Sequence, residues 1–190
     1  MRSGETAPPP GPAVDLEEED MTPLSAAAFS RVLPRLNEAE NRDEITTLLL
    51  SFLGEGFGRV VLFVHTQGML RGRDCRGEDL LVDAVRQVRI PMSGPSTFAA
   101  VIDSGVPHFG PWPQGSRVNE LFAAAMGGIR GNVLVLPVRL GVRVPLIVFA
   151  ANTPHPVDPR SLAELVDGVS GALERLIRAR KSQDNLPAVD

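Results

Sequence analysis

Two apolar, β-branched runs in the second half of the chain, separated only by a short glycine turn, constrain the fold most. The runs are Val133–Leu140 and Arg143–Ala151, and Gly141-Val142 lies between them. Two such runs with so short a connection predict an antiparallel β-hairpin. Pro137 and Pro145 lack the N–H that a strand ladder uses, so we expect a bulge or a sheet-edge position at each.

A second hairpin is predicted earlier in the chain. Arg59–Thr66 is apolar over most of its length, Gln67-Gly68 is typical of a tight turn, and Met69–Arg76 is a more polar strand. The alternation of apolar and charged residues predicts a further strand over Ala84–Ile90. A short strand is also predicted over Val106–Gly110. Hairpins require antiparallel neighbours, so a doubly wound parallel sheet is excluded.

Helices are predicted at both ends of this set of strands. Thr22-Pro23 resembles an N-cap followed by a first-turn proline, although Pro34 should break or kink the helix that follows. Asn41 and Glu44 have the spacing of a capping box, so a second helix begins there. Asp158-Pro159 begins a long amphipathic helix. Two shorter helices are predicted after Pro95, ending at Gly105, and over Arg117–Met126.

This order of elements predicts an α+β fold. We expect an antiparallel sheet of five to six strands, with the N- and C-terminal helices on one face and crossover helices on the other. The folded domain should span residues 23–180. Residues 1–22 are rich in proline and acid and have too few large apolar side chains to fold, so a disordered arm is predicted there, with a polar tail over 181–190.

The acidity of the chain is concentrated in that arm. The first 24 residues hold one arginine against six carboxylates, a net charge of −5, whereas the whole chain has −4 and the remainder therefore +1. A nearly neutral body disfavours nucleic-acid binding, which requires a clustered basic face. No apolar stretch approaches the length of a membrane span, and the N-terminus does not resemble a secretory signal, so we expect a cytoplasmic protein.

The strand–helix order and several local motifs resemble a GAF domain, over about Asn41–Arg178. The resemblance implies a small-molecule sensor or a dimerising interaction module, usually without enzymatic activity. The motifs that carry it are an apolar strand ending in proline, a small-residue helix, a glycine turn, and the closing hairpin and helix: Val88–Pro91, Ser93–Val101, Ile102–Pro107, Asn132–Leu140, Arg143–Ala151 and Pro159–Ile177.

The ligand signatures of that family are absent here. Its cyclic-nucleotide-binding members carry an Asn-Lys-Phe-Asp-Glu signature, but Lys181 is the only lysine of this chain. Its bilin-binding members need a cysteine in the crossover region, whereas Cys75 falls on the second predicted strand. Neither ligand carries over, and no cofactor is expected.

One segment is a candidate ligand site. His108, Phe109 and Trp112 lie in a short run that contains the only tryptophan of the chain, flanked by prolines. An aromatic platform beside a titratable ring suits a planar ligand or a partner side chain. The structural explanation, which we favour, is a loop held in place by burial of Trp112.

Arginines on the predicted second and third strands form a candidate partner site. Arg71 and Arg73 are two residues apart and should share a face, with Arg89 on the neighbouring strand. Such a face suits an acidic partner or the acidic arm of the chain itself. The alternative is the solvated side of an antiparallel sheet.

Other chemistry has weaker support. Cys75 lies between arginines, which favours a thiolate and a redox role, but a single cysteine is usually inert. The Gly127–Gly131 loop follows a helix and precedes a strand, the reverse of a phosphate-binding loop. The histidines lack metal-ligand spacing, and no nucleophile–base set is present, so neither a metal nor catalytic residues are expected.

The sequence therefore predicts a non-enzymatic cytoplasmic signalling module that acts through protein–protein interaction. It would be a bacterial adaptor or regulator of a kinase, response regulator or small GTPase system, and would dimerise through its terminal helices. Binding of nucleic acid or membrane is not expected. The alternatives are a small-molecule sensor with a pocket near His108–Trp112 and a redox sensor or enzyme that uses Cys75.

Overall fold

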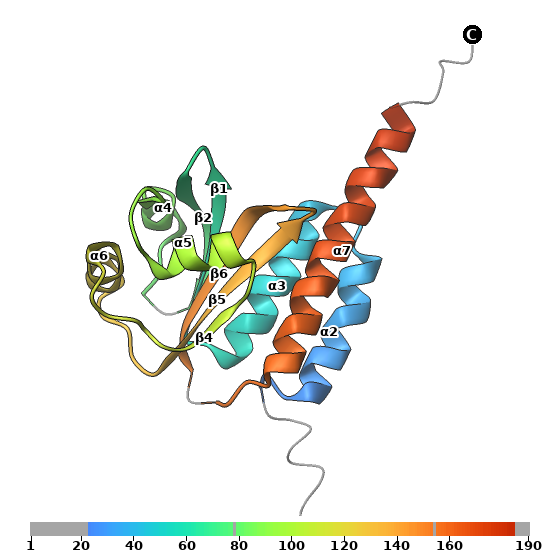
Figure 1. The fold of residues 1–190 in the computed structure, drawn as a ribbon. Helices are drawn as coiled ribbons and strands as arrows, with labels where there is room; N and C mark the ends of the chain where they lie inside the picture. Colours follow the sequence, from blue (N-terminus) through green and yellow to red (C-terminus); the bar gives the residue numbers. More distant parts are fainter. Residues whose placement is uncertain (1–22, 78, 154, 185–190) are drawn as a thin grey trace, which may run out of the picture.

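A six-stranded antiparallel sheet with helices on both faces forms the molecule (Figure 1). The computed structural model describes residues 23–77, 79–153 and 155–184. The predicted α+β class, with five to six antiparallel strands, is confirmed. The sheet order is β3-β2-β1-β6-β5-β4, and the strands are β1 Arg59–Thr66, β2 Met69–Gly77, β3 Arg89–Pro91, β4 His108–Pro111, β5 Asn132–Leu140 and β6 Arg143–Thr153.

The helices divide between the two faces as predicted (Figure 1). The N-terminal and C-terminal helices pack on one face, and the shorter crossover helices lie on the other. The first group is α2 Ala26–Glu38, α3 Arg42–Gly56 and α7 Pro159–Asp184; the second is α4 Val82–Val85, α5 Thr97–Ser104 and α6 Arg117–Ala125.

Strand alternation supplies both faces with apolar side chains. In β1, Val60 and Leu62 face the terminal helices, whereas Val61 and Phe63 face the crossover helices, and all four are at most 1% exposed. A sheet buried on both faces needs near-continuous apolar strands, which explains why β1, β5 and β6 carry the longest apolar runs of the sequence.

Helices α3 and α7 begin at the predicted residues, where side chains cap their first turns. Asn41 accepts a hydrogen bond from the Glu44 N–H at 2.8 Å, and the Glu44 carboxylate accepts one from the Glu40 N–H at 2.8 Å. The Asp158 carboxylate accepts from the Ser161 N–H at 3.1 Å, and this bond holds the pKa of that carboxyl below its usual range. These caps satisfy N–H groups that the helices cannot pair internally.

The start and the course of α2 differ from the prediction. The cap is Ser25, whose hydroxyl accepts from the Ala28 N–H at 3.3 Å; Thr22 lies outside the described residues. The helix also continues past Pro34 to Glu38, so of the predicted break or kink at this proline the break is wrong. Val32 and Leu36, on either side of Pro34, are both buried against the other terminal helices, and this burial offsets the hydrogen bond that proline removes.

The strand predicted over Ala84–Ile90 is also wrong. Residues 82–85 form the short helix α4, and only Arg89–Pro91 pairs with β2. Tertiary packing favours the helix, because Val85 is buried and sits directly against Gly72 of β2, where an added Cβ would overlap the Val85 carbonyl. The Gly72 N–H donates to the Val88 carbonyl at 3.2 Å, which fixes the return of the chain toward the sheet.

The two strand prolines lie where a missing N–H is tolerated. The β5–β6 register shifts between Val138 and Leu140, where β6 has one extra residue, and Pro145 lies in that bulge. Pro137 pairs with Ile147 beyond Val135, the last β5 residue paired with β4, so β5 has β6 on one side only at this point.

The ends of the domain are described only in part. The predicted arm over 1–22 and residues 185–190 of the predicted tail lie outside the described residues. Helix α7 continues past Lys181 to Asp184. Among the described residues, no helix combines the length and the hydropathy needed to cross a bilayer.

Candidate functional site

Aromatic rings fill the space between the sheet and the crossover helices. The ring centroids of contacting pairs in this cluster are 4.8 to 6.3 Å apart, and each of these pairs is edge-to-face or tilted. Such arrangements add to the free energy gained by burial. The aromatic cluster comprises Phe63 of β1, Phe98 of α5, Trp112, Phe122 of α6 and Phe149 of β6, none more than 7% exposed.

A buried asparagine of α6 ties this helix to α5 beside the aromatic cluster. The Asn119 Oδ1 accepts from the Thr97 N–H at 3.1 Å, and its Nδ2 donates to Thr97 Oγ1 at 2.9 Å and to the Pro113 carbonyl at 3.0 Å. The Trp112 indole N–H donates to the Asn119 carbonyl at 3.1 Å. Asn119 is 3% exposed, so these bonds are shielded from water.

The structure does not bring the three predicted ligand-binding residues together. Trp112 lies in the aromatic cluster, whereas Phe109 is half-buried against the core on the opposite face of the sheet. His108 lines a shallow cavity of about 430 Å³ together with Thr97 and Asn119, and its Nε2 lies 3.3 Å from the Pro111 carbonyl oxygen. Neighbouring strand residues point to opposite faces, which separates His108 from Phe109.

Cys75 is buried on β2 and faces the crossover side of the sheet. Burial raises the pKa of the Cys75 thiol, the Asp74 carboxylate raises it further, and the Arg76 guanidinium lowers it. The flanking arginines therefore do not produce the thiolate that their sequence positions suggested.

We expect folded Cys75 to react with iodoacetamide at least about tenfold more slowly at pH 8 than in the urea-unfolded chain. The raised pKa means that the folded protein keeps this proton at a higher pH than the unfolded one, so stability should fall as pH rises through the titration range of the unfolded thiol. Mass-spectrometric labelling from pH 7 to 10 measures this, and equal rates in both states would refute it.

The three predicted partner-binding arginines differ in their contacts. Arg73 is paired with Asp43 of α3, at 3.0 Å, and sits where the β1–β2 register shifts. Arg89 donates to the carbonyls of Arg86 and Val88. Arg71 lies opposite Arg89 in the β2–β3 ladder, and its side chain makes no hydrogen bond or ion pair with any described residue.

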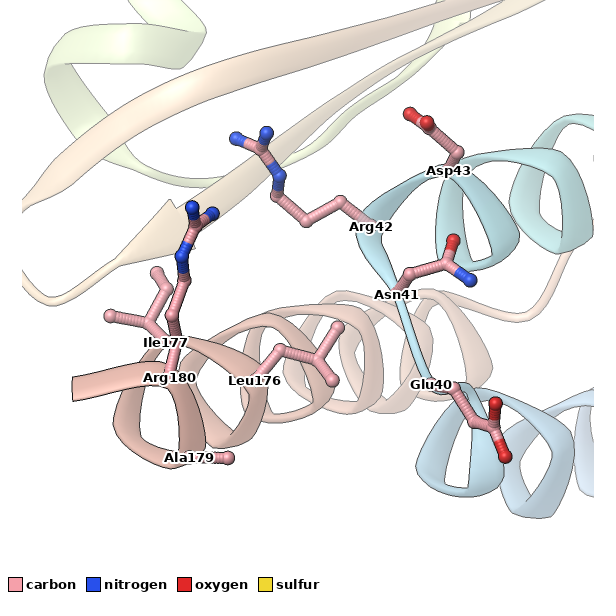
Figure 2. A pocket seen from close by; sticks show the side chains of 8 residues that line it. All are labelled: Glu40, Asn41, Arg42, Asp43, Leu176, Ile177, Ala179 and Arg180. Atoms are coloured by element: carbon pink, nitrogen blue, oxygen red, sulfur yellow. The ribbon is translucent and has the colours of Figure 1, made fainter. Parts of the chain in front are cut away.

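The structure also has two cavities that the sequence analysis did not predict. One, of about 500 Å³, lies between the start of α3 and the last turns of α7, where Arg42 and Arg180 extend to the same side and Glu40 points away from them (Figure 2). The other, of about 690 Å³, lies at the end of the sheet where the two hairpins turn. The sequence signal for this second cavity is the arginine that follows each hairpin turn. The cavity itself depends on the β1–β6 pairing, which places the two turns at the same end of the sheet.

No group of three or more histidine, cysteine, aspartate or glutamate side chains in the described part of the chain is placed to hold a metal ion.

No protein-family model and no curated protein matches the chain. Solved structures do. Residues 122 to 287 of a methyl-accepting chemotaxis protein superpose with a TM-score of 0.61 at 16% identity, covering 80% of this chain and 99% of that one. The GAF domain of a Coxiella burnetii phosphoenolpyruvate-protein phosphotransferase gives 0.59 at 16% identity, covering 84% and 95%.

The GAF domain of a two-component sensor histidine kinase from Bacillus halodurans gives a TM-score of 0.54 at 14% identity, covering 77% of this chain and all of that one. At these identities the comparisons show the fold alone. The chain has a GAF-like fold, as the resemblance in its sequence implied.

Proposed function

We propose that this protein is a non-enzymatic signalling module that acts by binding protein partners. Its structural neighbours include a chemotaxis protein and a sensor histidine kinase, which supports a signalling role. In this proposal residues 23–180 are the working domain of a bacterial cytoplasmic adaptor or regulator. A kinase, a response regulator or a small GTPase system would be its target.

The observation that carries the proposal is the pairing of Arg71 with Arg89. Like charges directly opposite one another on neighbouring strands destabilise a sheet. Neither guanidinium has a carboxylate partner among the described residues. An acidic segment of a partner protein would relieve this repulsion, and Arg73 lies at the border of the same surface.

The terminal helices offer a second surface, for self-association. Ile177 on α7 is 37% exposed, and Leu176 beside it is only partly buried. We propose that a second copy packs against this part of α7 in a homodimer. Light scattering of the wild type and of Ile177→Glu tests this, because a dimer through this surface becomes a monomer in the variant.

For the partner interaction, we expect the double variant Arg71→Glu/Arg89→Glu to weaken binding at least about tenfold, because each reversed charge replaces attraction by repulsion. The measurement is quantitative crosslinking in lysate, followed by titration of the purified partner. Arg130→Glu is the matched control, since Arg130 is also exposed and its side chain makes no ion pair with a described residue. Equal losses in both variants would contradict a role for the β2–β3 arginines.

The alternative of a small-molecule sensor rests on the cavity beside His108. Native mass spectrometry of the purified protein separates the two proposals, since a sensor would retain or take up a ligand whose loss follows substitution of His108. The filled aromatic cluster favours the interaction module.

A further inference from the structure

A cavity of about 690 Å³ lies where the turns of the two hairpins meet. The pairing of Val64 with Leu146 places the end of β1 beside the start of β6, so the two turns lie at the same end of the sheet. His65 of β1, Arg71 of β2 and Arg143 of β6 line the cavity. It has the size of a small-molecule site.

The charge of this cavity is of one sign. Arg71 and Arg143 line it, and neither side chain makes a hydrogen bond or an ion pair with any described residue. No aspartate or glutamate of the described chain lines it. Elsewhere on the domain, arginines such as Arg73 and Arg139 are paired with carboxylates at 3.0 and 3.6 Å. The cavity therefore attracts anions.

His65 adds a directional group. Its Nδ1 lies 3.0 Å from the Val144 carbonyl oxygen, so this nitrogen carries the proton and the ring orientation is set. The other ring nitrogen, Nε2, remains for a ligand. Nε2 accepts a hydrogen bond from a P–OH group when the ring is neutral, and it donates one to a phosphate oxygen when the ring is protonated.

We propose that this cavity binds the phosphate group of a small phosphorylated molecule. A carboxylate has two oxygens, and a single guanidinium group can donate hydrogen bonds to both. Two guanidinium groups and an imidazole instead match the three free oxygens of a phosphate monoester. The apolar side of the cavity, formed by Ile102, Val144 and Pro145, would contact the remainder of such a molecule. This site shares Arg71 with the partner surface proposed above, whereas Arg143 belongs to the cavity alone.

Calorimetric titration of the full chain at low ionic strength tests the site, with inorganic phosphate as the probe and citrate as a carboxylate comparison. We expect phosphate to bind more tightly than citrate. Arg143→Gln should weaken phosphate binding about tenfold, the loss of one charge-assisted contact, and Arg71→Gln/Arg143→Gln should abolish it.

Arg130→Gln is the matched control and should bind phosphate as the wild type does, and circular dichroism should show every variant folded. Saturable binding that is lost with Arg143 but kept with Arg130 supports the site. Absence of phosphate binding at 10 mM, tighter binding of citrate, or equal loss in the Arg130 variant would each overturn it. Arg143 is not part of the β2–β3 surface, so its result is independent of partner binding.

Discussion

Phe98→Ala is expected to lower the free energy of unfolding by about 3–5 kcal/mol, the usual cost of removing a fully buried ring. Phe98 is completely buried and touches four other rings of the aromatic cluster, with centroid distances of 5.0 to 6.3 Å. Sheet strands and helix α6 fix those rings from several sides, so the structure cannot close the gap, and the cost should lie at the upper end.

Urea unfolding followed by far-ultraviolet circular dichroism measures this loss, with Trp112 fluorescence as a second probe. Phe98→Leu keeps most of the volume and should cost less than about 1.5 kcal/mol. Leu121→Ala is the surface control, since Leu121 is 59% exposed and should change stability by less than about 0.5 kcal/mol. A Phe98→Ala loss below about 1 kcal/mol would mean that the space is not closely packed.

The same experiment bears on function. The aromatic cluster occupies the region between the sheet and the crossover helices. If its rings carry the stability of this half of the domain, an enclosed ligand could enter only by displacing them. A large loss of stability in Phe98→Ala therefore favours binding at the protein surface over binding of an enclosed ligand.

Elements whose signals are local could be predicted from the sequence. The β1–β2 turn is one example, because Gln67 and Gly68 both have positive φ, at 51° and 70°, as a tight hairpin turn requires. The capping bonds of Asn41 and Glu44 are another. In each case the responsible residues are within four positions of one another, and tertiary packing agrees with them.

Elements that depend on residues far apart in the chain could not be predicted from the sequence. The segment 84–90 alternates like a strand, but the fit of Val85 against Gly72 on another strand makes part of it helical. Arg71 and Arg73 were placed on one face by simple alternation, which the register shift beside Arg73 interrupts. The cavity of His65 and Arg143 exists only because residues almost eighty positions apart meet at one end of the sheet.

Asn119→Leu is expected to lower the free energy of unfolding by about 2–4 kcal/mol. Leucine matches the size of the side chain but leaves the Thr97 N–H and the Pro113 carbonyl without partners in a buried setting, and each unmade bond costs about 1–3 kcal/mol. The Thr97 amide lies in the first turn of α5, where the helix itself provides no acceptor. Hydrogen exchange should therefore show faster exchange at Thr97 than at amides of β1.

Gln114→Ala is the matched control, because its amide donates to the Trp112 carbonyl from an exposed position and should cost less than about 0.5 kcal/mol. If Asn119→Leu costs no more than this control, the Asn119 bonds do not tie α6 to α5. If it costs several times more, these bonds hold α5 and α6 against the aromatic cluster. The crossover side of the domain is then rigid, and under the proposed function partner binding would leave its interior unchanged.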